Sequence, residues 1–246
     1  MYLNVQGLVL RVSPYNETDA MLTVITRDHG LLSVKARGLR RKNSPLIAPC
    51  QLLALTDFVL FENRGFYTIN EANLVEIFNG LRKDLLKLSL GTYFAQVTEI
   101  ISQEDIPNPE LLSTLLNCLY MLSTKDISLS LVKAVFELRV ACIAGYTPDL
   151  NTCGCGSGTT ELFDVSEGCV VCVRCAKYRE SGIRMPVTPG VLESMRYISM
   201  CESKRLFSFK IGNETADELS QVTEVYLATQ LERGFSTLDF YKTLLI

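Results

Sequence analysis

The chain has 246 residues, of which 48% are hydrophobic, and a net charge of −3. This composition supports one large domain or two to three small ones, and it argues against intrinsic disorder. No apolar run approaches the roughly 20 residues that span a bilayer, and the N-terminus lacks the pattern of a signal peptide. We therefore expect a cytoplasmic protein without a membrane segment.

The acidic balance excludes a uniformly basic surface for nucleic acids. Up to Leu81 the sequence has eight basic and seven acidic side chains, against sixteen and twenty beyond it. Five of those first eight basic residues fall in one short stretch: Lys35, Arg37, Arg40, Arg41 and Lys42. Any DNA binding is therefore expected to be local.

The first eighty residues have the pattern of β structure. Short apolar, β-branched runs alternate with turn residues, and Asp28-His29-Gly30 is typical of a hairpin turn. The predicted strands cover residues 7–12, 20–26, 31–36, 51–61 and 66–74. Five short strands in this length favour a small closed barrel of the OB type.

From Arg82 onward the apolar residues follow the period of helices. Asn108 and Pro109 are typical of a helix N-cap and first helical position, and Thr188 and Pro189 repeat this signal. The predicted helices cover residues 82–101, 109–122, 128–144, 189–200, 214–232 and 238–245. We predict an α+β chain: a five-stranded OB-fold barrel over residues 1–80, then an all-helical domain over residues 81–246 with a zinc ribbon inserted at about 150–182.

That insert contains five of the nine cysteines. Two pairs, Cys153 with Cys155 and Cys172 with Cys175, resemble the knuckles of a zinc ribbon, in which four thiolates hold one tetrahedral ion. Cys169 is an alternative ligand, and a metal-free insert is a further alternative. Zn²⁺ is the expected metal because four soft thiolates suit it best.

No catalytic machinery is evident in the sequence. The single histidine, His29, lies in a turn, and neither a GxxxxGK[ST] nor a GxGxxG phosphate-binding loop is present. Four thiolates leave no open metal position for a reacting water, so the zinc is expected to be structural. We predict a protein that is not an enzyme.

The basic stretch from Lys35 to Lys42 follows a predicted strand and has the composition of a turn. We expect a mobile hairpin here, and its five cations can follow a phosphate backbone by releasing condensed counterions. Tyr15, Phe58, Phe61, Phe66 and Tyr67 are candidates for stacking on bases. A charge run is also typical of a solvated loop, and aromatic residues are more often part of a core.

Taken together, these segments resemble the RecO family of bacterial recombination mediators. The resemblance spans nearly the whole chain in order. It is found at Gly7 to Leu10, Tyr15 to Leu22, Lys35 to Arg41, Phe136 to Leu138, Gly145 to Leu150 and Cys172 to Cys175. One departure is the first cysteine pair, which in the family is usually C-x-x-C and here is Cys153-x-Cys155.

The resemblance implies a DNA repair and recombination mediator, located in the cytoplasm with the nucleoid. Such a protein would bind single-stranded and duplex DNA and anneal complementary strands. It would also load RecA with the help of RecR. The basic segment would contact phosphates, and the helical domain would receive the acidic, aromatic-ended C-terminal tail of the single-stranded DNA-binding protein.

That tail requires an apolar pocket with a cationic rim, and Lys133 and Arg139 lie near the relevant helix. The rival interpretation is a zinc-ribbon adaptor or transcription factor that acts mainly through protein contacts.

Overall fold

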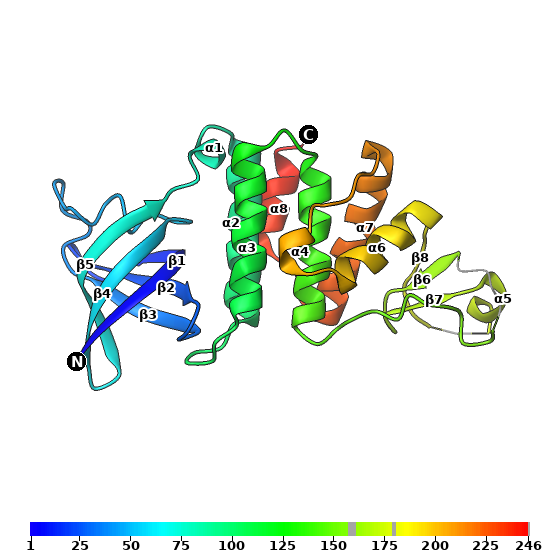
Figure 1. The fold of residues 1–246 in the computed structure, drawn as a ribbon, viewed down its shortest axis with the longest axis horizontal. Helices are drawn as coiled ribbons and strands as arrows, with labels where there is room; N and C mark the ends of the chain where they lie inside the picture. Colours follow the sequence, from blue (N-terminus) through cyan, green and yellow to red (C-terminus); the bar gives the residue numbers. More distant parts are fainter. Residues whose placement is uncertain (157–160, 179–180, 246) are drawn as a thin grey trace. The chain divides into compact units, whose positions relative to one another are not determined.

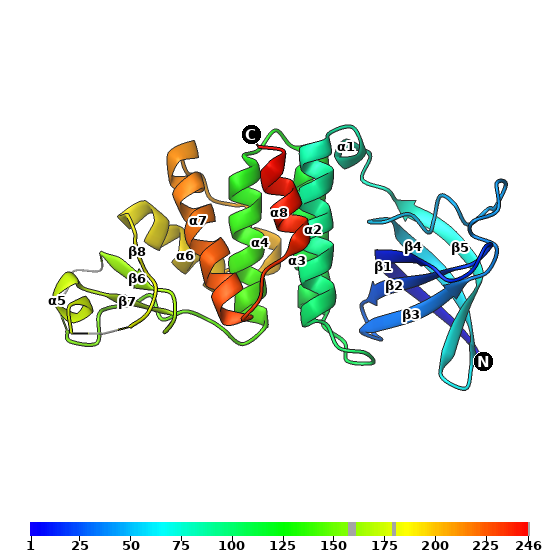
Figure 2. The ribbon, with the colours of Figure 1, turned by 180° about the vertical axis from the view of Figure 1, so that it is seen from behind.

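The computed structural model describes residues 1–156, 161–178 and 181–245 (Figure 1, Figure 2). Contacts within the chain define two compact units. One comprises Met1–Thr124 together with Phe235–Ile246, and the other comprises Lys125–Gly234. Within the described residues, no helix combines the length and the apolar character needed to cross a membrane. The predicted domain boundary at residue 80 stays a prediction.

Five strands form a closed barrel in the first unit: β1 (Tyr2–Pro14), β2 (Ala20–Thr26), β3 (Leu31–Ala36), β4 (Leu55–Asn63) and β5 (Phe66–Glu76). Their order is β1-β2-β3-β5-β4, and β1 closes the sheet by pairing with both β2 and β4. The barrel interior is filled by alternate apolar side chains, including Val9, Leu22, Val34, Phe58 and Leu60. The predicted five-stranded barrel is confirmed.

The start of β4 differs from the prediction, which placed a strand from residue 51. Leu53 has a φ of 61°, a left-handed conformation that no regular strand contains. Its N–H donates to the carbonyl of Val9, and the N–H of Val9 donates to the carbonyl of Ala54. Those bonds satisfy the backbone of a turn at this point, so the strand begins only at Leu55.

The first unit also contains α1 (Asn79–Arg82), α2 (Leu85–Ile101), α3 (Pro109–Thr124) and α8 (Ser236–Thr243). The side chain of Asp84 accepts hydrogen bonds from two backbone N–H groups and so caps α2. Asn108 caps α3 through the N–H of Leu111. Helix α2 packs on β1, α3 and α8. The α3 start and its cap agree with the prediction.

The second unit is built around α4 (Leu129–Ile143), which packs against α7 (Asn213–Gln230) and α6 (Pro189–Met200). Helix α4 is buried on almost every side, and its three charged residues have partners within the unit. The Nζ of Lys133 lies 2.9 Å from carboxylate oxygens of both Glu137 and Glu224. Thr223 donates a further hydrogen bond to Glu137. A short 3-10 helix, η1 (Ser203–Arg205), follows α6.

The cysteine-rich module forms the rest of the second unit. Its sheet has the order β7-β6-β8, with β6 (Leu162–Asp164) between β7 (Cys169–Val171) and β8 (Arg184–Pro186). The ring of Phe163 packs edge-on against that of Tyr226 from α7, with 5.2 Å between centroids. This contact anchors the module to the helices that surround α4. The predicted helical region with a cysteine-rich insert is confirmed.

Candidate functional site

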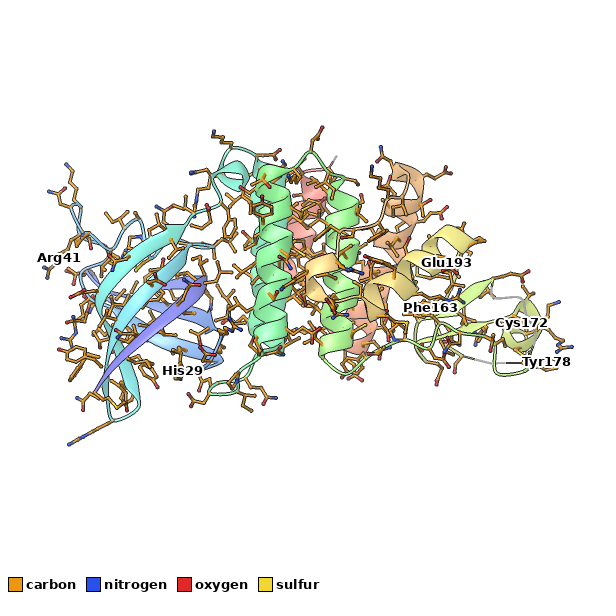
Figure 3. All side chains as sticks on the ribbon, viewed as in Figure 1. His29, Arg41, Phe163, Cys172, Tyr178 and Glu193 are labelled. Carbon is orange, nitrogen blue, oxygen red and sulfur yellow. The ribbon has the colours of Figure 1, made fainter. Side chains whose placement is uncertain are left out.

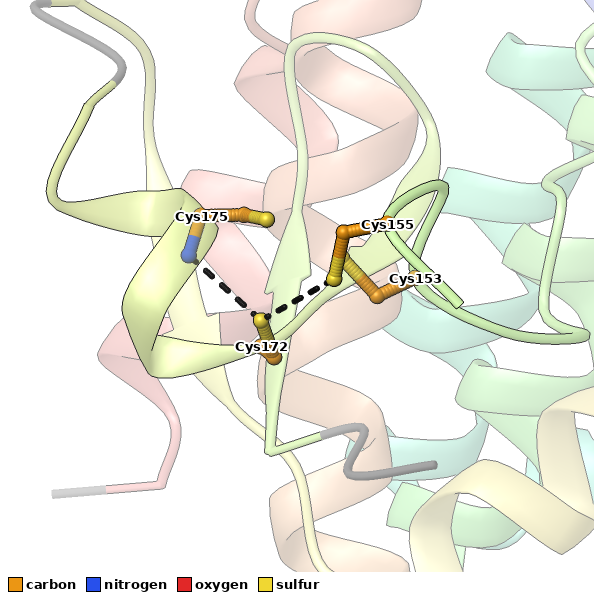
Figure 4. A group of neighbouring side chains, drawn as sticks. All are labelled: Cys153, Cys155, Cys172 and Cys175. Atoms are coloured by element: carbon orange, nitrogen blue, oxygen red, sulfur yellow. Dashed lines mark hydrogen bonds between the residues drawn. The ribbon is translucent and has the colours of Figure 1, made fainter. Parts of the chain in front are cut away.

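The four cysteines of the two predicted pairs converge in space (Figure 4). Cys153 and Cys155 lie in the loop before β6, where Gly156 adopts a φ of 75° and its N–H donates to the carbonyl of Cys153. Glycine accommodates this left-handed turn without strain. Cys172 caps α5 (Val173–Ala176), which contains Cys175. Two tight backbone turns therefore present the two pairs of thiols to one another.

The spacing of the sulfur atoms fits a tetrahedral ion. All four Sγ atoms lie within 4.8 Å of one another, and the Sγ of Cys155 is 3.6 Å from that of Cys153 and 3.7 Å from that of Cys172. Zn–S bonds of about 2.3 Å would place the sulfurs of a tetrahedron about 3.8 Å apart. These distances are far longer than a disulfide bond, and none of the four cysteines is in a disulfide.

Electrostatics within the group favour a bound cation. A hydrogen bond from the backbone of Cys155 lowers the pKa of the Cys153 thiol. Hydrogen bonding to neighbouring sulfurs, first that of Cys155, raises the pKa of Cys175 to about 12. Four thiols at this distance cannot all ionise without a positive charge between them. A divalent ion would supply that charge, because metal binding displaces the thiol protons.

Arg174 and Cys169 lie next to the four-cysteine cluster. Arg174 donates from Nη2 to the Sγ of Cys155 across 3.7 Å, and this contact raises the pKa of its guanidinium. Cys169 lies in β7 opposite Asp164 and packs against the cluster, but its sulfur is outside the group of four. The structure thus brings together the four predicted ligands. That these four bind a metal stays a prediction.

The basic segment begins at Lys35 near the end of β3 and continues into the connection between β3 and β4. It was predicted to form a hairpin, and this is wrong: β3 pairs with β2 and β5, whereas β4 pairs with β1 and β5. Consecutive turns connect the two strands instead. The side chain of Leu39 enters the barrel core and anchors the first turn.

Two of its five cations are held by other parts of the barrel. The Nζ of Lys35 lies 3.2 Å from a carboxylate oxygen of Asp19 and 4.5 Å from the centre of the Tyr15 ring. Arg40 donates to the carbonyl of Asn16. The backbone N–H of Gly38 donates to Asp19 and is the first cause that lowers the pKa of this carboxyl. Asp19 therefore organises the base of the segment.

The other three cations, Arg37, Arg41 and Lys42, are exposed. Within the part of the chain that the structure describes, no ion pair or side-chain hydrogen bond holds any of them. Figure 3 shows Arg41 directed away from the barrel. The structure therefore presents three cations to solvent on one anchored turn, which is the arrangement that contact with a phosphate backbone needs.

The candidate aromatic residues divide between core and surface. Phe58 is 2% exposed and belongs to the barrel core, and Tyr67 is half-buried. Tyr15, Phe61 and Phe66 are exposed, and Phe61 packs against the ring of Tyr2. Of the five candidates in the barrel, only the three exposed rings can stack on a base.

Lys133 and Arg139 do not line a surface pocket. Lys133 lies in the buried network described above, and Arg139 donates to the carbonyls of Ile198 and Ser199 at the end of α6. The second unit has a hollow of about 780 Å³ elsewhere, between α6, along its length from Gly190 to Met200, and residues 201–211 that follow it. Apolar side chains of Tyr197, Met200, Phe209 and Ile211 line it, together with the cations Arg196, Arg205 and Lys210. Sequence periodicity does not predict this hollow, because half of its lining residues lie outside α6.

The family model described as Recombination protein O N terminal matches residues 1–78, and that described as Recombination protein O C terminal matches residues 82–239. The chain belongs to the RecO family of DNA repair proteins.

The similarity to individual relatives also extends over whole chains. DNA repair protein RecO of Acetivibrio thermocellus is 32% identical over 246 residues, which cover 99% of this chain and 97% of the relative. DNA repair protein RecO of Alkaliphilus metalliredigens is 30% identical, with 98% and 99% covered. DNA repair protein RecO of Bacillus subtilis is 29% identical, with 92% and 88% covered.

Proposed function

We propose that this protein is a recombination mediator that binds single-stranded and duplex DNA, anneals complementary strands and, with RecR, loads RecA. The observation that carries the proposal is the exposed triplet Arg37, Arg41 and Lys42 in a chain of the RecO family. The mediator acts without catalysis, in the cytoplasm at the nucleoid. The barrel of residues 1–80 is its DNA-binding domain.

Annealing needs no covalent chemistry, because the obstacle is repulsion between two polyanions. Cations on an exposed turn lower that repulsion by approaching the phosphates of a strand and releasing its counterions. Lys35 and Arg40 hold the turn in place, because their contacts with Asp19 and Asn16 fix its base. Tyr15, which contacts Lys35, is placed to stack on a base next to the bound phosphates.

The thiolate cluster holds a structural Zn²⁺ in this proposal. Cys153, Cys155, Cys172 and Cys175 would be its ligands, and the ion would supply only positive charge and a fixed tetrahedral geometry. The four residues join the loop before β6 to α5, so that metal binding secures a module with little apolar core of its own.

The hollow beside α6 is the proposed site for the tail of the single-stranded DNA-binding protein. Its volume lies in the range of ordinary ligand pockets. Tyr197 and Phe209 offer an apolar floor to an aromatic residue, and Arg205 and Lys210 offer cations to acidic ones. Arg196 is less available because it pairs with Glu193.

A peptide with the tail's sequence tests this assignment. Changing Arg205 and Lys210 to alanine should weaken its binding, measured by fluorescence anisotropy, at least tenfold. Lys204→Ala is the matched control, because Lys204 is exposed and adjacent to Arg205 but does not line the hollow. Equal affinity in all variants would exclude this site.

Annealing of two labelled complementary strands across a salt series tests the function as a whole. Acceleration that fades steeply with salt supports the mediator. The adaptor interpretation would instead be supported by a sequence-specific footprint on duplex DNA without annealing.

A further inference from the structure

The turn that follows the second cysteine pair carries an exposed aromatic residue next to cations. Tyr178 is 84% exposed and Val173 is 45% exposed, and Arg174 and Lys177 are exposed as well. Among the described residues, no side-chain hydrogen bond or ion pair engages Lys177 or Tyr178. Figure 3 shows Tyr178 at the edge of the module that also contains Cys172. An aromatic side chain this large and this exposed has no role in the packing of the module.

The backbone that presents Tyr178 is the backbone that presents the thiols. The N–H groups of Ala176, Lys177 and Tyr178 donate to the carbonyls of Cys172, Val173 and Cys175 respectively. The direction of the Tyr178 side chain therefore depends on a turn that begins at one candidate ligand and contains another. Metal binding would fix the display of this surface.

The cations on this surface offset the negative charge that a metal–thiolate group would bring, so the surface can bind a nucleic acid. Four thiolates around a divalent ion have a formal surplus of negative charge, and Arg174 offsets part of it through its contact with Cys155. The guanidinium has five N–H donors, so this contact leaves others for a second partner. Lys177 adds a cation next to the Tyr178 ring.

We propose that Arg174, Lys177 and Tyr178 form a second contact for single-stranded DNA. Tyr178 stacks on an unpaired base, while Lys177 and Arg174 approach the neighbouring phosphates. An exposed ring flanked by cations is the combination with which proteins hold single strands without reading their sequence. The inference rests on the proposed DNA binding and adds a surface in the second unit to the basic segment in the first. Two contacts for single strands on one chain provide what annealing requires.

The absence of tryptophan from the sequence gives a direct test. In the Tyr178→Trp variant the only indole reports on this surface, and we expect an oligothymidylate to quench its emission. The quenching should follow the binding curve obtained from the anisotropy of the labelled oligonucleotide. Tyr120→Trp is the matched control, because Tyr120 is an exposed tyrosine of α3, 51% accessible, and its indole should not respond.

Two further variants measure the size of the contact. Tyr178→Ala should weaken oligonucleotide binding roughly tenfold, in the lower part of the range for one stacked base. Lys177→Ala should reduce the salt slope of log affinity by about 0.7, the value for one phosphate contact of a single strand. Lys125→Ala, which removes an exposed lysine elsewhere in the second unit, should change neither quantity. Zinc content of each variant confirms that the module is folded.

The outcomes separate this inference from the function on which it rests. If the chain binds the oligonucleotide but the indole at position 178 does not respond, the second contact is refuted and the proposed function stands. If the chain binds no oligonucleotide at all, both are refuted. A response to the single-stranded DNA-binding protein alone would make the surface a protein contact and overturn the inference. Loss of the quenching after zinc removal, with residual oligonucleotide binding, would support a surface fixed by the metal.

Discussion

The exposed triplet of the basic segment leads to the sharpest prediction. Changing Arg37, Arg41 and Lys42 together to glutamine removes three charges and keeps long, polar side chains. All three are exposed, so the substitutions should alter the free energy of unfolding by no more than about 0.5 kcal/mol each. Lys35 and Arg40 remain, which leaves the contacts with Asp19 and Asn16 at the base of the segment unchanged.

The size of the effect follows from the number of free cations. Each phosphate contact of a single strand contributes about −0.7 to the slope of log affinity against log salt, so the loss of three contacts should flatten the slope by about 2. Between about 50 and 200 mM salt, the parent protein should therefore lose roughly 20-fold more affinity than the variant does. Annealing should slow in the variant, and most clearly at low salt.

Anisotropy of a labelled oligonucleotide, measured across this salt range, gives the slope. The matched control changes Arg27, Arg64 and Lys83 to glutamine, which removes three exposed charges from other parts of the same unit. That control should keep the parent slope within the error of the assay. A slope that is the same in the parent and in the triplet variant would remove the basic segment from the proposed mechanism.

Two further predictions concern the second unit. Cys172→Ser should abolish binding of stoichiometric zinc, whereas Cys169→Ser should keep it, as measured by zinc released to a colorimetric chelator; equal zinc content in both would refute the ligand assignment. Lys133→Met should lower the free energy of unfolding by about 3–5 kcal/mol near neutral pH, because it removes the cation beside the buried Glu137. Burial raises the pKa of Glu137, and removal of Lys133 raises it further. The loss should therefore grow as pH rises through the raised pKa that Glu137 has in the parent protein, and it should shrink in acid, where Glu137 is protonated in both proteins. Denaturant unfolding at several pH values measures this, and a loss independent of pH would contradict the assigned cause.

Most of the fold could be predicted because local signals and tertiary contacts agree. Apolar, β-branched runs bounded by turn residues identified β2 and β3 at their observed bounds, and the Asn108-Pro109 and Thr188-Pro189 signals identified the starts of α3 and α6. The error at β4 has a physical origin. Leu53 is apolar and fits a strand pattern, but its left-handed φ is imposed by hydrogen bonds with β1, which is distant in sequence.

The candidate site could be predicted only where its residues are close in sequence. The spacing of the cysteines was sufficient to bring together two pairs, because each pair lies on its own tight turn. Which cations of the basic segment are held and which are exposed could not be predicted from the sequence. Asp19 and Asn16 reach their partners Lys35 and Arg40 only after β2 and β3 pair. The hollow beside α6 depends on the irregular segment after η1, for which sequence periodicity gives no signal.

The net negative charge of the chain does not conflict with DNA binding through so few cations. Charges separated by more than about 8 Å are largely screened at physiological salt, so acidic residues elsewhere do little to cancel an exposed turn. Asp19 neutralises Lys35, and it also accepts a hydrogen bond from the N–H of Gly38. One cation of the segment is therefore paired, and that pairing helps to fix the turn that presents the three exposed cations.

Under the proposed function, three phosphate contacts would give weak, salt-sensitive binding, and this would be a defect in a protein that had to find DNA alone. A mediator tethered by the tail of a protein that already coats the strand meets its DNA at a high effective concentration. Weak contacts then become an advantage, because a mediator that anneals strands must also release the duplex that it forms.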